Sequence, residues 1–143
     1  MMKVTREFSF ETAHMLSNYD GPCKNLHGHS YKLQVTLKGG PKNSAGESDS
    51  EMVMDFTDLK AIVEERVISK VDHAVLFSSK EHRREAEEML LQWAQIYNMR
   101  HVVLNGRSTC ETIAAWIRSQ LVPALGGDIY VRVWETAKSF AEV

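Results

Sequence analysis

The segment "HGHSYKLQVTLK", residues 27–38, alternates between two kinds of side chain. One set consists of two histidines followed by aromatic and aliphatic residues: His27, His29, Tyr31, Leu33, Val35 and Leu37. The residues between them are small or polar. Successive side chains of a strand point to opposite faces of a sheet, so this period of two predicts a half-buried strand. Its histidines are expected to point the same way as its core residues.

The preceding segment "VTREFSFETAH", residues 4–14, alternates in the same way. Its inward side is expected to carry Val4, Arg6, Phe8, Phe10, Thr12 and His14. Residues 15–26 are rich in turn formers and are expected to form the loop between the two strands. Antiparallel pairing across this loop would bring His14 close to His27 and His29.

Further along the chain, the sequence predicts both helices and strands. We expect a glycine-rich loop over 39–50, a short strand over 51–56 and then a helix capped by Thr57. Residues 71–77 follow no clear period. Residues 101–104 and 128–137 are typical of strands. This order predicts an α+β fold with a mostly antiparallel sheet.

Two capping boxes predict two further helices. Ser78 and Glu81 would open the first, which would end near Met99, and Ser108 and Glu111 would open the second. The core-facing stripe of the first helix is expected to be Met89, Leu90, Trp93, Ile96 and Tyr97.

The composition is that of an ordinary globular protein. The chain has 143 residues, of which 43% are hydrophobic and 25% charged, and its net charge is −2. This length predicts one domain over residues 1–143. The weak charge argues against nucleic-acid and membrane partners, and no apolar run approaches the ~20 residues of a membrane span. The N-terminus lacks a signal-peptide pattern and two cysteines are too few for a disulfide framework, so a cytoplasmic location is expected.

The three histidines of the predicted hairpin form a candidate metal site. His14, His27 and His29 all lie on inward strand faces, and Gly28 leaves space between the last two. Three imidazoles around one point are the ligand set of a catalytic zinc site with an open fourth position. The alternative is that they are hydrogen-bonded core histidines. Zinc is the expected ion because neutral imidazoles suit it and no carboxylate cluster favours a harder ion.

Cys23 and Glu135 are the next candidates. Cys23 lies in the loop before His27, where a thiol can act as a base or nucleophile, complete a metal site as fourth ligand, or be a plain loop cysteine. Glu135 continues the inward face of the last strand, and a buried carboxylate needs a partner such as a ligand with paired N–H groups or an arginine. An exposed turn between helices explains Asp72 and His73 locally. The capping box with Ser108 explains Glu111 locally.

Taken together, these motifs resemble the family of 6-pyruvoyltetrahydropterin and 6-carboxytetrahydropterin synthases. The resemblance spans nearly the whole chain and rests on motifs in a fixed order: "FSFETAH" (8–14), "CKNLHGHSY" (23–31), "MVMDFTDLK" (52–60), "VDHAVL" (71–76), "STCETIAAWI" (108–117) and "VWET" (133–136). It implies a T-fold, in which an antiparallel sheet carries helices on one face and subunits assemble as trimers or hexamers closing into barrels. Active sites then lie between subunits.

The resemblance also implies roles for individual residues. His14, His27 and His29 match the zinc ligands, and Cys23 matches the catalytic base. Asp72 and His73 match its proton-transfer partners, which a neighbouring subunit can supply. Glu135 matches the carboxylate that anchors the pterin, and Thr109 and Glu111 match further pterin-binding positions. These implied roles take the place of the exposed turn for Asp72 and His73 and of the helix cap for Glu111. For Glu111, a capping role remains an alternative to pterin binding.

The reaction implied starts from 7,8-dihydroneopterin triphosphate. The carboxy enzymes release triphosphate and acetaldehyde and leave 6-carboxytetrahydropterin for queuosine synthesis, whereas the pyruvoyl enzymes leave a diketone. The spacing C-x-x-x-H-G-H resembles the bacterial carboxy type, but the extra segment at roughly 80–104 departs from its shortest members. The rival readings are a non-catalytic zinc-stabilised binding module and another pterin enzyme, such as an aldolase or a cyclohydrolase-like relative. Lys24 and Lys138 are the candidate residues for contacts with the triphosphate.

Overall fold

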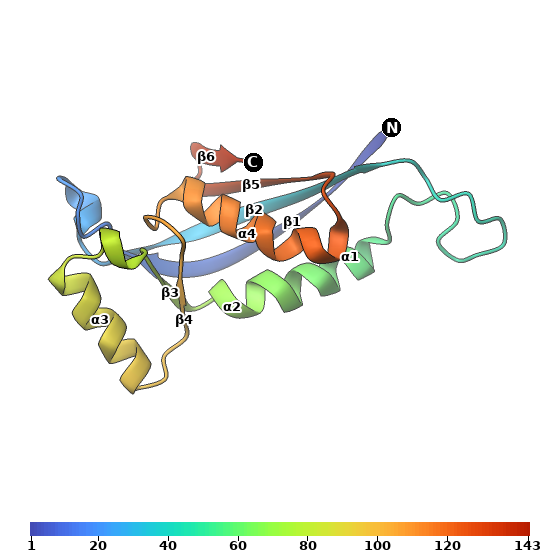
Figure 1. The fold of residues 1–143 in the computed structure, drawn as a ribbon. Coiled ribbons are helices and arrows are strands. Elements are labelled where there is room, and N and C mark those ends of the chain that lie inside the picture. The colour runs from blue at the N-terminus through green and yellow to red at the C-terminus, as the bar shows by residue number, and fades with distance from the viewer.

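A computed structural model describes all residues from 1 to 143. Its centre is a six-stranded sheet in the order β4-β3-β1-β2-β5-β6 (Figure 1). The strands are β1 (Met2–His14), β2 (His27–Gly39), β3 (Ala74–Phe77), β4 (His101–Val103), β5 (Ile129–Thr136) and β6 (Ser139–Glu142). The pairs β1–β2, β2–β5 and β5–β6 are antiparallel, whereas β1–β3 and β3–β4 are parallel. The predicted α+β fold is confirmed, with a mixed sheet.

The helices are α1 (Phe56–Val63), α2 (Ser69–Val71), α3 (Glu85–Ile96) and α4 (Cys110–Leu125). A π-helical segment, Glu64–Ile68, joins α1 to α2, and short 3-10 turns occur at Pro22–Lys24 and Lys80–His82. The α1–α2 run and α4 cover one face of the sheet, while α3 lies beside the β3–β4 end (Figure 1). The core between sheet and helices includes Phe8, Phe10, Leu33, Val35, Leu59, Val63, Ile113 and Ile117.

The hairpin of β1 and β2 forms as the alternation predicted. Its register pairs Met2 with Gly39 at one end and His14 with His27 at the other. Along both strands the predicted inward positions from Phe8 to His14 and from Tyr31 to Leu37 are buried, while their neighbours are more exposed. Because both strands keep the period of two to their ends, the terminal histidines stay on the core side of the sheet.

One predicted strand is absent, and one strand lies in a segment that showed no pattern. Residues 51–56 form no strand, because Asp55 caps α1: its carboxylate accepts a hydrogen bond from the Thr57 N–H at 2.6 Å, so Thr57 lies inside the helix. Residues 74–77, which show no alternation, form β3. Both faces of this strand are covered, one by the main core and the other by α3, so both are apolar and no period of two appears.

The predicted capping boxes are also wrong. The helix expected from Ser78 begins only at Glu85, and Ser78 instead donates its N–H to the Glu87 carboxylate. In α4 the cap is Thr109 rather than Ser108, which is buried. The predicted stripe of α3 is largely exposed, and the side that faces the protein carries Glu87, Leu91 and Ala94. The side of α3 that faces the protein thus includes a buried carboxylate and differs from the side that the apolar stripe predicted.

Candidate functional site

The hairpin brings the three predicted histidines together at its open end. His14 and His27 are paired across the strands, and His29 lies opposite Thr12. One ligand atom from each histidine lies within 4.8 Å of the others, and Nε2 of His14 is 3.1 Å from Nε2 of His27. Bonds of about 2.0–2.1 Å at tetrahedral angles place two zinc-bound nitrogens roughly 3.3 Å apart, so this separation fits two ligands of one ion.

The outer nitrogens of two histidines are held by backbone carbonyls. Nδ1 of His14 lies 2.6 Å from the Ser108 oxygen, and Nδ1 of His27 lies 2.7 Å from the Asn25 oxygen. Because a carbonyl oxygen only accepts, each Nδ1 carries a hydrogen, and in the neutral ring each Nε2 then keeps its lone pair. Two lone pairs then face each other across 3.1 Å. That contact is repulsive until a cation lies between them, so the donor set fits a metal ion.

The environment of His14 and His29 favours the neutral imidazole, which is the form that binds metal. Burial is the main cause that lowers the pKa of His14 below its ordinary value of 6.5, and it also lowers the pKa of His29. The nearby Glu135 carboxylate acts in the opposite direction on both groups. Nε2 of His29 approaches Oε1 of Glu135 to 3.3 Å, but it is buried without a hydrogen bond. This nitrogen is therefore also available to a metal ion.

A cavity of about 400 Å³ contains four of the other predicted residues. Cys23, Thr109, Glu111 and Glu135 all line it, from the first loop, the start of α4 and the end of β5. Cys23 does not belong to the histidine group that can hold a metal, so the geometry gives no support to a fourth-ligand role. The cavity instead places the thiol in a space that also contains the Glu135 carboxylate.

Thr109 and Glu111 have different local roles from those that the capping box predicted. The Thr109 hydroxyl caps α4 by accepting the Thr112 N–H at 3.4 Å. Glu111 makes no capping hydrogen bond with Ser108, and it lies exposed in the first turn of the helix. Its carboxylate is therefore free of the competing cap role.

Arg107 is a cavity residue that the sequence did not indicate. It is the only lysine, arginine or histidine among the residues that line the cavity. Its Nε is buried without a hydrogen-bond partner, and its guanidinium lies 5.8 Å from the centre of the Tyr19 ring. An isolated arginine in the segment "NGRST" carries no recognisable pattern, so only the fold connects it with Cys23 and Glu135.

Asp72 and His73 lie away from this cavity in the same chain. Oδ2 of Asp72 is 3.0 Å from Nδ1 of His73, and Oδ1 accepts the Glu11 N–H at 2.9 Å. That backbone hydrogen bond is the main cause that lowers the pKa of Asp72. His73 adopts a left-handed conformation with φ of 57°, and its side chain is 77% exposed. The pair is thus held in a fixed, outward-facing position.

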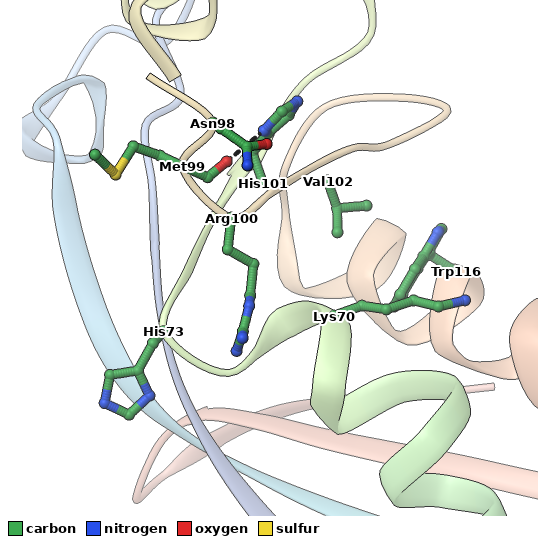
Figure 2. A pocket seen from close by; sticks show the side chains of 8 residues that line it. All are labelled: Lys70, His73, Asn98, Met99, Arg100, His101, Val102 and Trp116. Carbon is green, nitrogen blue, oxygen red and sulfur yellow. Dashed lines mark hydrogen bonds between the residues drawn. The ribbon is translucent and has the colours of Figure 1, made fainter. Parts of the chain in front are cut away.

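His73 borders a second and larger hollow of about 920 Å³, drawn in Figure 2. Lys70, Arg100, His101 and Trp116 also line this hollow. Figure 2 shows Arg100 extending toward the turn that carries His73, where its Nη1 donates to the Asp72 carbonyl at 2.7 Å. Cys23 and Glu135 are absent from this lining. One chain therefore does not bring all the predicted catalytic residues together.

Gly28 separates His27 from His29, and a side chain there is expected to disturb the histidine group. A Cβ at this position would lie 3.1 Å from the Thr12 carbonyl oxygen on the paired strand. The backbone of Thr12 and Ala13, which precedes His14 on β1, must give way to this Cβ, and that shift changes the position of His14 relative to His27 and His29. We expect Gly28→Ala to lower both the melting temperature and the metal affinity. Gly40→Ala is the control in both measurements, because a Cβ there meets nothing within 4 Å.

A protein-family model and several named relatives match most or all of the chain. The sequence model of the family described as 6-pyruvoyl tetrahydropterin synthase matches residues 3–143. A Haemophilus influenzae protein named 6-carboxy-5,6,7,8-tetrahydropterin synthase is 38% identical over 99% of this chain and 98% of its own length. A Synechocystis protein of the same name is 32% identical, over 87% of this chain and all of its own. The resemblance read from the motifs is confirmed.

Solved structures support the fold. The 6-pyruvoyltetrahydropterin synthase of Plasmodium vivax, a mutant form, superimposes with a TM-score of 0.70 at 21% identity, covering 99% of this chain and 96% of that one. The Caenorhabditis elegans enzyme gives 0.67 at 23% identity, with 99% and 94% covered. The α+β fold is thus the T-fold that the motifs implied. None of the helices has the length and apolar character needed to span a bilayer. Sequence and fold together establish that the chain belongs to the 6-pyruvoyl tetrahydropterin synthase family.

Proposed function

We propose that this protein is a zinc-dependent 6-carboxytetrahydropterin synthase. It would convert 7,8-dihydroneopterin triphosphate into 6-carboxy-5,6,7,8-tetrahydropterin, acetaldehyde and triphosphate, a step of queuosine synthesis. The observation that carries the proposal is the histidine group directly beside a cavity lined by Cys23 and Glu135. Its support in sequence is the full-length similarity to relatives named for that activity.

Each residue of the site has its own role in the proposed reaction. Glu135 accepts N–H groups of the pterin ring and so fixes the substrate in the cavity, with Thr109 and Glu111 as further contacts. Cys23 as a thiolate removes a proton from the substrate carbon next to the ring, where the ring makes the C–H bond acidic. A zinc ion on His14, His27 and His29 would supply Lewis-acid polarisation of the two hydroxyls of the substrate. Arg107 is the cation that this cavity offers to the phosphates.

Asp72 and His73 fit the proposal if a second subunit supplies them, because the exposed His73 and its partner Asp72 do not line the cavity of Cys23 and Glu135 in their own chain. The sheet offers edges for such an assembly. Of β1, β3 covers only Thr12–His14, which leaves the outer edge of β1 from Met2 to Glu11 without a partner strand. We therefore propose a cytoplasmic homo-oligomer, a trimer or hexamer, of one T-fold domain per chain.

The alternative function is 6-pyruvoyltetrahydropterin synthesis from the same substrate. A Dictyostelium discoideum relative named 6-pyruvoyl tetrahydrobiopterin synthase is 31% identical over 84% of this chain. Incubation with dihydroneopterin triphosphate separates the two, because only the carboxy reaction breaks a carbon–carbon bond. Acetaldehyde in amounts equal to the triphosphate released supports the proposal, whereas a diketone pterin without acetaldehyde supports the alternative.

Glu135→Gln is expected to weaken pterin binding by about 2–4 kcal/mol, on the scale of a broken charge-assisted hydrogen-bond pair. Glutamine keeps the shape of the side chain but turns one acceptor into a donor, which then faces an N–H of the ring. Titration with a non-phosphorylated dihydropterin measures the loss, and metal analysis of the same variant should still give wild-type zinc content. Glu142→Gln, a change on β6 where the carboxylate pairs with Arg132, is the control. Equal pterin affinity in Glu135→Gln and wild type would exclude the anchor role.

A further inference from the structure

A buried carboxylate that the proposed reaction does not use lies in the first turn of α3. Glu87 is fully buried, with an exposed fraction of 0%. Acidic side chains are rarely buried to this degree without a specific set of partners. Glu87 does not line the cavity and does not belong to the histidine group. Its burial therefore calls for an explanation outside the site described above.

Two donors satisfy the Glu87 carboxylate. The Ser78 N–H donates to Oε1 at 2.7 Å, and the Ser17 hydroxyl donates to Oε2 at 2.5 Å. Ser17 Oγ in turn accepts the Arg84 N–H at 2.9 Å, so its own hydrogen is directed to Glu87. Both carboxylate oxygens thus act as acceptors, as an ionised group requires, and the N-terminus of α3 favours negative charge there.

The hydrogen bonds continue from Ser78 to the metal-site histidine. Ser78 Oγ accepts the Ser108 N–H at 3.0 Å and lies 3.4 Å from Ser108 Oγ. The Ser108 hydroxyl donates to the Met15 carbonyl at 3.3 Å. The Ser108 carbonyl then accepts the Nδ1–H of His14 at 2.6 Å. Ser78, Ser108 and His14 are each no more than 1% exposed, so water does not replace these contacts.

We propose that Glu87 is a positioning residue for the metal centre. Its carboxylate fixes Ser78, Ser78 fixes the Ser108 peptide, and that peptide sets the orientation and the tautomer of His14. Outer partners of metal-bound histidines act in this way on ligand geometry. The inference rests on the proposed zinc site and adds to it a role for α3, the helix of the extra segment that the shortest bacterial relatives were expected to lack.

The experiment compares metal-free preparations of the wild type, Glu87→Gln and Glu85→Gln. Glu85 lies in the same helical turn but is exposed, so its change removes one charge from the helix start without touching the network. Zinc affinity is measured by competition with a chelator, and the ligand geometry is measured from the visible absorption spectrum of the cobalt(II) protein. We expect Glu87→Gln to bind zinc about 10-fold more weakly, the lower end of the range for outer partners, and to change the cobalt spectrum. Glu85→Gln should match the wild type in both.

A folded Glu87→Gln protein with wild-type zinc affinity and an unaltered cobalt spectrum would overturn the proposal. A purely structural role would lower only the melting temperature, which is recorded in parallel. Ser78→Ala gives a second route if Glu87→Gln does not fold, because it removes only the hydroxyl that holds the Ser108 N–H. The same two changes are expected there, and wild-type values would again refute the network. Failure of the wild type itself to bind zinc would refute the proposed metal centre, whereas unaltered variants beside a zinc-binding wild type refute only the role of Glu87.

Discussion

Cys23→Ala is expected to lower turnover by about 10²–10⁴-fold, the usual cost of removing a general base, while leaving the metal and the bound pterin in place. The thiol lies in the cavity with Glu135 but outside the histidine group, so its loss should not reach the metal ligands. Single-turnover kinetics with dihydroneopterin triphosphate measures the chemical step, and metal analysis and pterin titration of the same preparation test whether binding survives.

Cys110 provides the matched control, because it is the only other cysteine and lines the same cavity. Burial raises the pKa of its thiol to about 11, and its Sγ donates to the Val133 carbonyl at 3.3 Å, so it stays protonated. Cys110→Ala should retain turnover within a few-fold of wild type. Alkylation should modify Cys23 first, and bound pterin should slow that reaction. If Cys23→Ala loses zinc in step with activity, the thiol is a ligand and the base role is wrong.

The second large effect is expected at the metal itself. His27→Ala removes one of three imidazoles, and it also leaves His14 Nε2 without the neighbour that lies 3.1 Å away. Wild-type protein should purify with about one zinc per chain, and the variant should lose most of it, together with all turnover. Elemental analysis after dialysis against a weak chelator gives the result. His82→Ala, a histidine on the 3-10 turn outside the group, should keep its metal. Full zinc occupancy in His27→Ala would refute the ligand assignment.

The sequence was most informative where structure is local. The alternation of two strands joined by one loop was enough to place His14 beside His27 and His29, because register and side-chain direction follow from the same period of two. The inward carboxylate of Glu135 followed in the same way from β5. These predictions needed no knowledge of contacts between distant segments.

Prediction from the sequence failed where the contact partner of a residue lies far away along the chain. β3 lacks alternation because packed elements cover both of its faces. The protein-facing side of α3 includes Glu87, whose partner Ser17 lies 70 residues away. Ser-x-x-Glu is a local capping pattern, so the sequence predicted Ser108 as a helix cap. The Ser108 carbonyl instead accepts a hydrogen bond from His14 at the end of β1. Arg107 joins the cavity only through tertiary structure.

The placement of all three histidines on one hairpin has a consequence for the order of folding. His14 and His27 are only 13 residues apart, so they meet as soon as β1 pairs with β2, at a small cost in loop entropy. The carbonyl that holds His14 comes from Ser108, which is 94 residues away and reaches the hairpin only when α4 docks. Because closing the longer loop costs more entropy, we expect the hairpin contact to precede the docking of α4. Under the proposed function, a zinc ion would cross-link the hairpin as soon as β1 and β2 pair, and its final affinity would be reached only when α4 brings the Ser108 carbonyl to His14.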